Sequence, residues 1–123
     1  MSKMTIFWVI IGLLVVGGIG ATWYQKTLPG QYDTLAKCLG EKGATFYGAF
    51  WCPHCQAQKK MFGNSAKLLP YVECSEPNGK DQTPICKEKE IVQYPTWIFA
   101  DGSRISGEQQ PADLASKTGC TLP

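Results

Sequence analysis

Residues 45–55 read Thr-Phe-Tyr-Gly-Ala-Phe-Trp-Cys-Pro-His-Cys. The first six of them are uncharged and rich in aromatic side chains, a composition that is typical of a buried strand. Pro53 comes shortly afterwards, and proline is well tolerated in the first turn of a helix. The stretch therefore predicts a strand that ends directly before a Cys-Pro-His-Cys motif and a helix that begins within it.

The two thiols of this motif are spaced to close a disulfide across one helical turn. Cys52, at the helix start, would face unpaired backbone N–H groups and the positive end of the helix dipole. Both features stabilise a thiolate, which is the nucleophile of disulfide exchange. We therefore expect Cys52 to be the attacking residue and Cys55, one turn deeper, to resolve a mixed disulfide. A protonated His54 would add positive charge near Cys52 and favour the reduced pair, as expected of a donor of disulfides.

The same spacing also occurs in inert disulfide staples and in metal sites. A zinc site usually needs a second close pair of ligands, and the next two cysteines, Cys74 and Cys86, are not close in sequence. Haem attachment needs a histidine directly after the second cysteine, where this chain has Gln56. A soft ion such as Cu(I) held by the motif cysteines stays open as an alternative. We expect no cofactor and no resident metal.

Helices and strands alternate outward from this motif. We expect helices at residues 33–42, from 53 past 60 with a bend near 63–64, at 85–91 and at 111–118, and strands at 45–50, 71–74, 96–100 and 103–106. Asp101-Gly102 is the turn signal of a hairpin between the last two strands. The alternation implies two parallel strands joined by a crossover, with an antiparallel strand added at the edge. The predicted fold class is α/β, a small mixed sheet with helices on both faces.

The N-terminal segment differs from the rest of the chain. Met4 to Gln25 carries no charged residue, and as a helix it would extend roughly 33 Å, enough to cross a hydrocarbon core of about 30 Å. Trp23 and Tyr24 would lie at the membrane interface. The alternatives are a signal peptide cleaved near Gly18-Ile19-Gly20, which would leave a secreted domain, and a buried helix of a soluble protein.

Three parts follow from this division: a membrane anchor or signal segment at residues 1–25, a linker at 26–32 that contains Pro29-Gly30, and one domain at 33–123. Lys3 and the start amine favour a cytoplasmic N-terminus, which places the domain on the extracytoplasmic side, whether periplasmic, lumenal or at the cell surface. The chain has 12 basic and 10 acidic residues, a net charge of +2. This balance lacks the basic footprint of a nucleic-acid-binding protein, so we expect no nucleic-acid partner.

Residues 50–55, Phe-Trp-Cys-Pro-His-Cys, followed about forty residues later by Tyr94-Pro95-Thr96, resemble the thioredoxin superfamily. The resemblance covers essentially all of residues 34–119 and implies a thioredoxin-like fold. It also implies that Pro95 is a cis proline facing the motif cysteines, and that the Tyr94 backbone is offered to a thiol-containing protein substrate. Trp51 would be a half-exposed side chain beside the cysteines.

More narrowly, residues 47–55, Tyr-Val-Glu-Cys at 71–74 and Gln-Tyr-Pro-Thr-Trp at 93–97 are similar to one group of thioredoxin-like domains. These domains are fused to, or work beside, bacterial homologues of vitamin K epoxide reductase. The resemblance implies a membrane quinone reductase as redox partner, either vitamin K epoxide reductase-like or DsbB-like, which here would be a separate protein.

Two departures from ordinary thioredoxin favour oxidation over reduction. The buried acid that cytosolic thioredoxins carry six residues before the first cysteine, where it assists proton transfer from the second thiol, is replaced here by Phe46. The Pro-His dipeptide looks like that of the strongly oxidising DsbA proteins. We therefore expect a membrane-anchored, extracytoplasmic thiol–disulfide oxidoreductase that oxidises secreted protein thiols. An exported disulfide reductase or isomerase, and a non-catalytic module that binds a soft metal, are the alternatives.

Four further cysteines lie outside the motif, and they are Cys38, Cys74, Cys86 and Cys120. An even number in an exported domain makes disulfides plausible. With the motif cysteines paired, three connectivities remain, and we predict Cys74–Cys86 and Cys38–Cys120 as structural disulfides. The first would close a polar loop between a strand and a helix, and the second would tie the first helix of the domain to the C-terminus. A relay of electrons through Cys74–Cys86, or free thiols, would be the alternatives.

Overall fold

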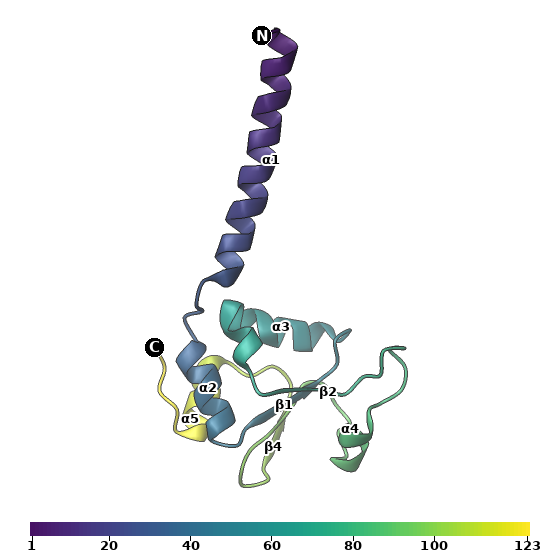
Figure 1. Ribbon diagram of the computed structural model, residues 1–123. Helices are drawn as coiled ribbons and strands as arrows, with labels where there is room; N and C mark the ends of the chain where they lie inside the picture. The colour runs from purple at the N-terminus through teal and green to yellow at the C-terminus, as the bar shows by residue number, and fades with distance from the viewer.

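The computed structural model describes residues 1–123 as a small α/β domain from which one long helix projects (Figure 1). The elements follow one another in the order that the sequence predicts. The helices are α1 (Lys3–Thr27), α2 (Asp33–Glu41), α3 (Pro53–Phe62), the 3₁₀ helix η1 (Gly63–Leu68), α4 (Pro84–Glu88) and α5 (Pro111–Thr118), and the strands are β1 (Thr45–Gly48), β2 (Tyr71–Glu73), β3 (Thr96–Ile98) and β4 (Arg104–Ser106).

A four-stranded mixed sheet with the strand order β2-β1-β3-β4 forms the centre of the domain. β1 and β2 are parallel, with Phe46 opposite Tyr71, and α3 with η1 connects them. β3 pairs antiparallel with both β1 and β4. The turn between β3 and β4 contains Gly102 at a φ of +83°, which glycine adopts readily because it has no Cβ. The predicted fold class, a small mixed sheet in an α/β domain, is confirmed.

The two faces of the sheet are covered unequally. Phe46 of β1 and Trp97 of β3 stack with their ring centroids 4.9 Å apart, in the main core that also contains apolar side chains of α2, α3 and α5. Consecutive side chains of a strand point to opposite faces. Tyr47 therefore lies on the other face, in a smaller cluster with Cys74 and with Cys86 of α4. Three helices cover the face that carries the main core, and the short α4 lies against the other.

Element ends differ from the sequence prediction by a few residues. α2 begins at Asp33, as expected, with Tyr32 as its N-cap, and ends at Glu41 rather than at residue 42. α4 ends at Glu88 rather than at residue 91, because Glu90 takes a φ of +55°, outside the helical region.

The projecting helix α1 is long and apolar enough to cross a membrane, and none of its side chains is buried by the rest of the protein. A core helix of a soluble domain would be packed against other elements. The alternative that this segment is a buried helix is therefore wrong, and α1 has the character of a membrane anchor or a signal sequence. Its first turn is capped by Ser2, whose hydroxyl accepts a hydrogen bond from the Thr5 amide at 3.3 Å.

The segment after α1 is tied to the domain at η1. The Asn64 side-chain amide donates to the carbonyl oxygens of Gln25, at 2.8 Å, and Leu28, at 3.2 Å. The Tyr32 amide donates to the Ser65 hydroxyl at 2.9 Å. The last turn of α1 and the start of the domain are therefore held by neighbouring residues of one 3₁₀ helix.

Two disulfides join elements of the domain. Cys38 of α2 is bonded to Cys120, which follows α5, and Cys74 at the end of β2 is bonded to Cys86 of α4. The first bond ties the C-terminal segment to the main core. The second closes the loop between β2 and α4, and both of its cysteines are fully buried.

Candidate active site

The junction between β1 and α3 positions both cysteines of the motif. β1 ends at Gly48, two residues earlier than the sequence indicated, because the chain turns there and the Cys52 amide donates to the Ala49 carbonyl oxygen at 3.1 Å. Cys52 is then the N-cap of α3, and Cys55 lies in its first turn, after Pro53 at the first helical position. Both cysteines are free thiols, with Cys52 6% exposed and Cys55 completely buried. Only Cys52 keeps access to the surface.

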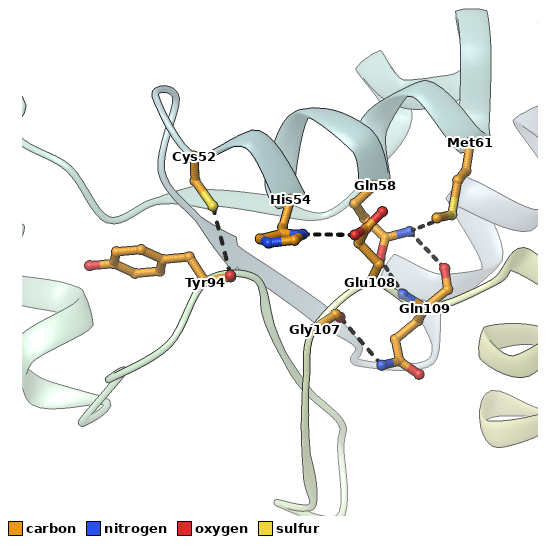
Figure 2. Close-up of polar contacts among 8 residues, drawn as sticks. All are labelled: Cys52, His54, Gln58, Met61, Tyr94, Gly107, Glu108 and Gln109. Atoms are coloured by element: carbon orange, nitrogen blue, oxygen red, sulfur yellow. Dashed lines mark hydrogen bonds and ion pairs between the residues drawn. The ribbon is translucent and has the colours of Figure 1, made fainter.

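The backbone before Pro95 faces the Cys52 sulfur. The Tyr94–Pro95 peptide bond is cis, as the thioredoxin resemblance implied. Cys52 Sγ lies 3.7 Å from the Tyr94 carbonyl oxygen, within hydrogen-bonding distance for sulfur (Figure 2). The Gly107 amide donates to the Pro95 carbonyl oxygen at 2.8 Å, which fixes the segment from the side of β4. The structure thus brings Cys52, Tyr94 and Pro95 together.

Cys55 lies in a tightly packed position behind Cys52. The pKa of the Cys55 thiol is raised to about 12. Burial is the largest cause and the neighbouring Cys52 thiol also raises it, whereas a hydrogen bond with the Ala49 backbone and the positive charge of Lys59 lower it. A Cβ at Gly48 would come within 2.8 Å of Cys55 Sγ, so only glycine leaves room for the sulfur. In the reduced protein at neutral pH, Cys55 is therefore a protonated thiol.

Tyr71 and Glu73 of β2 form a polar group next to Cys55. The Tyr71 hydroxyl donates to Glu73 Oε2, and burial together with this carboxylate raises the pKa of Tyr71. Lys59 Nζ lies 3.7 Å from the centroid of the Tyr71 ring, a cation–π distance. Glu73 Oε1 accepts hydrogen bonds from the amides of Phe50, at 2.9 Å, and Ser75, at 3.2 Å. This carboxylate therefore braces the chain directly before Trp51.

Trp51 lies next to Cys52 in the chain and is 47% exposed. Its Nε1–H donates to the Ser75 hydroxyl at 2.8 Å, and its ring meets the Tyr94 ring edge to face, with centroids 5.9 Å apart. The Tyr94 hydroxyl in turn accepts a hydrogen bond from Gln82 at 2.9 Å. Both aromatic residues that flank Cys52 are therefore held by the loop that the Cys74–Cys86 disulfide closes.

His54 points away from the helix into an open groove. Its Nδ1 lies 2.8 Å from Glu108 Oε2, and its side chain is 70% exposed (Figure 2). The groove has a volume of about 590 Å³ and is lined by residues of α3, of the segment before Pro95 and of the segment after β4, namely His54, Gln93, Tyr94, Ser106, Gly107 and Glu108. Tyr94, which lines the groove, also contacts the Cys52 sulfur through its carbonyl oxygen, so the groove lies next to this contact.

Sequence reasoning identified the motif residues and the Tyr94-Pro95 pair, but it missed Gln58, Tyr71, Glu73 and Glu108. Each of these contacts a residue far away in the chain, so no local spacing revealed its role. No group of three or more His, Cys, Asp or Glu side chains is placed to hold a metal ion. The site combines one accessible thiol, one buried thiol and a groove that can receive a polypeptide.

No protein-family model matches the chain. The chain is similar to the thiol-disulfide oxidoreductase LTO1 of Arabidopsis thaliana, with 49% identity over 92 residues. The matched region covers 72% of this chain and 24% of that protein, so the chain spans about a quarter of the length of the curated relative that it matches.

Proposed function

We propose that this chain is a thiol–disulfide oxidoreductase of the thioredoxin-like type, which exchanges disulfides through Cys52 and Cys55. The observation that carries the proposal is the pair of thiols at the start of α3, in which the accessible Cys52 faces the Tyr94 carbonyl oxygen and Cys55 is buried behind it. The similarity to a relative that is named a thiol-disulfide oxidoreductase supports the same chemistry.

In the oxidising direction, the cycle begins with a Cys52–Cys55 disulfide. A substrate thiolate attacks Cys52 Sγ, so that a bond between substrate and Cys52 forms while the Cys52–Cys55 bond breaks and Cys55 leaves with the electron pair. Cys55 then takes up a proton, because its pKa of about 12 keeps it a thiol at neutral pH. A second substrate thiolate attacks the substrate sulfur of the mixed disulfide and releases Cys52. Two electrons have then passed from the substrate to the cysteine pair. Of the two protons that the substrate thiols lose, one is on Cys55 and the other is on Cys52 or in the solvent.

The groove beside Cys52 is the proposed place for the substrate chain. Its wall contains the Tyr94 backbone and His54. An extended segment that carries the reacting thiol would lie along Tyr94 and Pro95, with its sulfur directed at Cys52. Trp51 covers the side of Cys52 that faces the loop before α4, where Ser75 holds its indole.

We further propose that the net direction is oxidation of secreted protein thiols. Phe46 is fully buried and stacks on Trp97 at the position where ordinary thioredoxins carry an acid that helps to deprotonate the second thiol. A reductase needs Cys55 to lose its proton and attack the mixed disulfide between Cys52 and the substrate. Without an acid at position 46, no base from this position assists that proton loss. Re-oxidation would come from a quinone-linked membrane protein of the vitamin K epoxide reductase or DsbB type.

The location that fits this chemistry is the extracytoplasmic side of a membrane, with α1 as a single anchor and residues 33–123 as the exposed domain. α1 has the length and apolar character of a membrane span. The two disulfides, Cys38–Cys120 and Cys74–Cys86, are typical of an oxidising compartment. Cysteine accessibility at the two ends of α1 in membrane vesicles, read with a membrane-impermeant thiol reagent on single-cysteine variants, tests the orientation.

Substitution of each motif cysteine tests the proposed roles. The full-length chain in detergent, oxidised beforehand, is mixed with a reduced protein substrate and the products are trapped with acid and a maleimide. We expect the wild type to oxidise the substrate and Cys52→Ser to have no activity. Cys55→Ser cannot form the internal disulfide, so its Cys52 is first converted to a mixed disulfide with thionitrobenzoate; a substrate with a single thiol should then displace the thionitrobenzoate and remain bound to Cys52 as a mixed disulfide. Exchange that persists in Cys52→Ser would contradict the assignment. Tight stoichiometric Cu(I) binding without turnover would instead indicate a metal-binding module.

The redox potential of the Cys52–Cys55 pair tests the direction. A potential well above about −200 mV means that the reduced form is favoured and that the protein gives disulfides away, as DsbA does at about −120 mV. A potential near thioredoxin's value of about −270 mV would contradict net oxidation and leave the exchange chemistry in place.

A further inference from the structure

We infer that Glu108 is a positioning residue for His54. The buried side chain of Gln58 holds the backbone next to Glu108, and the Glu108 carboxylate fixes the imidazole beside Cys52. The fixed imidazole in turn shifts the redox equilibrium of the Cys52–Cys55 pair. The inference rests on the proposed function. It assigns a role to a loop residue that no motif of the sequence includes.

The contact itself joins two elements that are far apart in sequence. His54 Nδ1 lies 2.8 Å from Glu108 Oε2, and the Glu108 side chain is 32% exposed. An exposed pair of this kind normally contributes little, because two flexible side chains must be ordered to form it. Its contribution rises when the backbone that carries one partner is already fixed, since less conformational entropy is then lost.

Gln58 fixes the residue after Glu108. Gln58 is completely buried on α3, one turn after His54. Its Nε2 donates to the Gln109 carbonyl oxygen at 2.8 Å, and its Oε1 accepts from the Gln109 amide at 2.7 Å (Figure 2). The same oxygen accepts from Trp97 Nε1 at 3.3 Å. A buried side-chain amide that lost these partners would destabilise the folded protein. The backbone of Gln109 is therefore held firmly to α3.

Gly107 fixes the residue before Glu108. The Gly107 amide donates to the Pro95 carbonyl oxygen at 2.8 Å, and the Gly107 carbonyl oxygen accepts from Gln109 Nε2 at 3.3 Å. Gly107 has a φ of +93°, which favours glycine and turns the chain toward α3. Glu108 therefore lies between two anchored residues, one bound to α3 and one bound to the cis-proline segment. The backbone that carries the Glu108 carboxylate is therefore fixed in position next to His54.

The contact decides how the imidazole is oriented. A carboxylate that accepts from Nδ1–H makes Nδ1 the donor nitrogen and fixes the plane of the ring, as second partners of functional histidines generally do. Nε2 is then the nitrogen left free on the other side of the ring, away from Glu108. In the view of Figure 2 the ring is seen between Glu108 and the Cys52–Tyr94 contact. Apart from His54 and Glu108, the groove contains only the Tyr94 phenol as a titratable group, and that hydroxyl is engaged by Gln82.

Loss of Glu108 would act on the redox equilibrium of the Cys52–Cys55 pair in two opposite directions, and this makes the inference testable. A freed imidazole spends less time beside Cys52 and stabilises its thiolate less, which shifts the equilibrium with glutathione toward the disulfide. The loss of the negative charge of Glu108, acting directly on Cys52, would shift the equilibrium toward the reduced pair. A positioning role predicts the first sign, and it predicts that the shift requires His54.

A double-mutant cycle of Glu108 and His54, on the full-length chain in detergent, separates the positioning effect from the direct charge effect. We expect Glu108→Ala to shift the equilibrium constant of Cys52–Cys55 with glutathione about two- to fivefold toward the disulfide, the range of an exposed ionic contact. Glu108→Gln keeps an acceptor for Nδ1–H and should restore most of the wild-type value. In a His54→Ala background, Glu108→Ala should leave the constant unchanged. The ¹⁵N chemical shifts of His54 should report one fixed tautomer in the wild type and a mixture in Glu108→Ala.

The outcomes that would overturn the role are distinct. A shift toward the reduced pair, a shift of equal size without His54, or an effect of Glu108→Gln as large as that of Glu108→Ala would each show that Glu108 does not act by positioning His54. Unchanged equilibrium and unchanged ¹⁵N shifts in Glu108→Ala would do the same. A wild-type protein that does not exchange with glutathione at all would overturn the proposed function, and this role with it.

Discussion

The Cys52 sulfur lies 3.7 Å from the carbonyl oxygen of Tyr94, although the two residues are 42 positions apart. One comes from the start of α3 and the other from the segment before β3. Gln82 holds the Tyr94 hydroxyl, and Gly107 holds the carbonyl oxygen of Pro95. The accessible thiol thus faces a strand-like backbone that is braced from two loops, an arrangement suited to holding a substrate chain while its sulfur reacts.

The raised pKa of Cys55 predicts a specific pH dependence of its reactivity. In a Cys52→Ser variant, the only free thiol is Cys55, and burial, the largest cause of its shift, remains. A pKa near 12 leaves about one part in ten thousand as thiolate at pH 8. We expect its alkylation by iodoacetamide to be slow and to rise about tenfold per pH unit between pH 8 and 10. The Cys55→Ser variant is the control, and its Cys52 thiol, which keeps access to the surface, should react faster at pH 8. A plateau near pH 9 in Cys52→Ser would contradict the buried-thiol assignment.

The same pKa shift predicts how stability depends on pH. The folded, reduced protein holds the Cys55 proton more tightly than the unfolded chain, whose thiol has its ordinary pKa of 9.0. Between pH 9 and 12 the folded state therefore binds more protons, and the free energy of unfolding must fall as pH rises through this window. The oxidised protein has no Cys55 proton to lose. We expect the Tm of the reduced protein to fall relative to that of the oxidised protein above pH 9. A constant difference from pH 8 to 11 would contradict this prediction.

Local patterns and distant contacts differ in how well the sequence predicts them. The Cys-Pro-His-Cys motif could be placed at the junction of β1 and α3 because its signals, an apolar run and a helix-starting proline, lie next to one another. The end of α4 was misplaced because the positive φ of Glu90 has no local signature in a non-glycine residue. Gln58 reads as an ordinary polar helix position, and its burial against Gln109 emerges only when α5 and its preceding loop pack onto α3.

Gly48 is predicted to be intolerant of a side chain. A Cβ at this position would lie 2.8 Å from Cys55 Sγ and 3.0 Å from the Tyr71 ring. Gly48→Ala should therefore lower the free energy of unfolding by about 1–3 kcal/mol, as overpacking does, and should displace the resolving thiol. The denaturant midpoint and the rate of exchange measure the two effects. Gly40→Ala is the matched control: its Cβ would meet Pro70 at 3.7 Å, an ordinary contact, within a helix that alanine favours. Equal midpoints for the two variants would contradict the argument.

The Cys74–Cys86 disulfide is predicted to resist reduction in the folded protein. Both sulfurs belong to fully buried residues, whereas Cys52 keeps some access to the surface, so a small thiol reaches the motif pair more readily than Cys74–Cys86. Graded treatment with dithiothreitol, followed by maleimide labelling and peptide mapping, should show the motif pair reduced first and Cys74–Cys86 only with unfolding. The bond should contribute about 3 kcal/mol by closing a short loop. Reduction of Cys74–Cys86 together with the motif pair would instead support an electron relay.

Asn64 is predicted to set how firmly the end of α1 is held to the domain. Its side-chain amide bonds the carbonyl oxygens of Gln25 and Leu28, and removing it frees both. Each such bond contributes about 0.5–1.5 kcal/mol, and two are lost, so Asn64→Ala should raise the rate of tryptic cleavage after Lys26 by about fivefold or more in the full-length chain in detergent. Asn78→Ala is the control, because Asn78 bonds only within its own loop, at Asp81 and Lys80. If the two variants are cleaved at the same rate, Asn64 does not restrain the linker, and the domain is free to turn relative to α1.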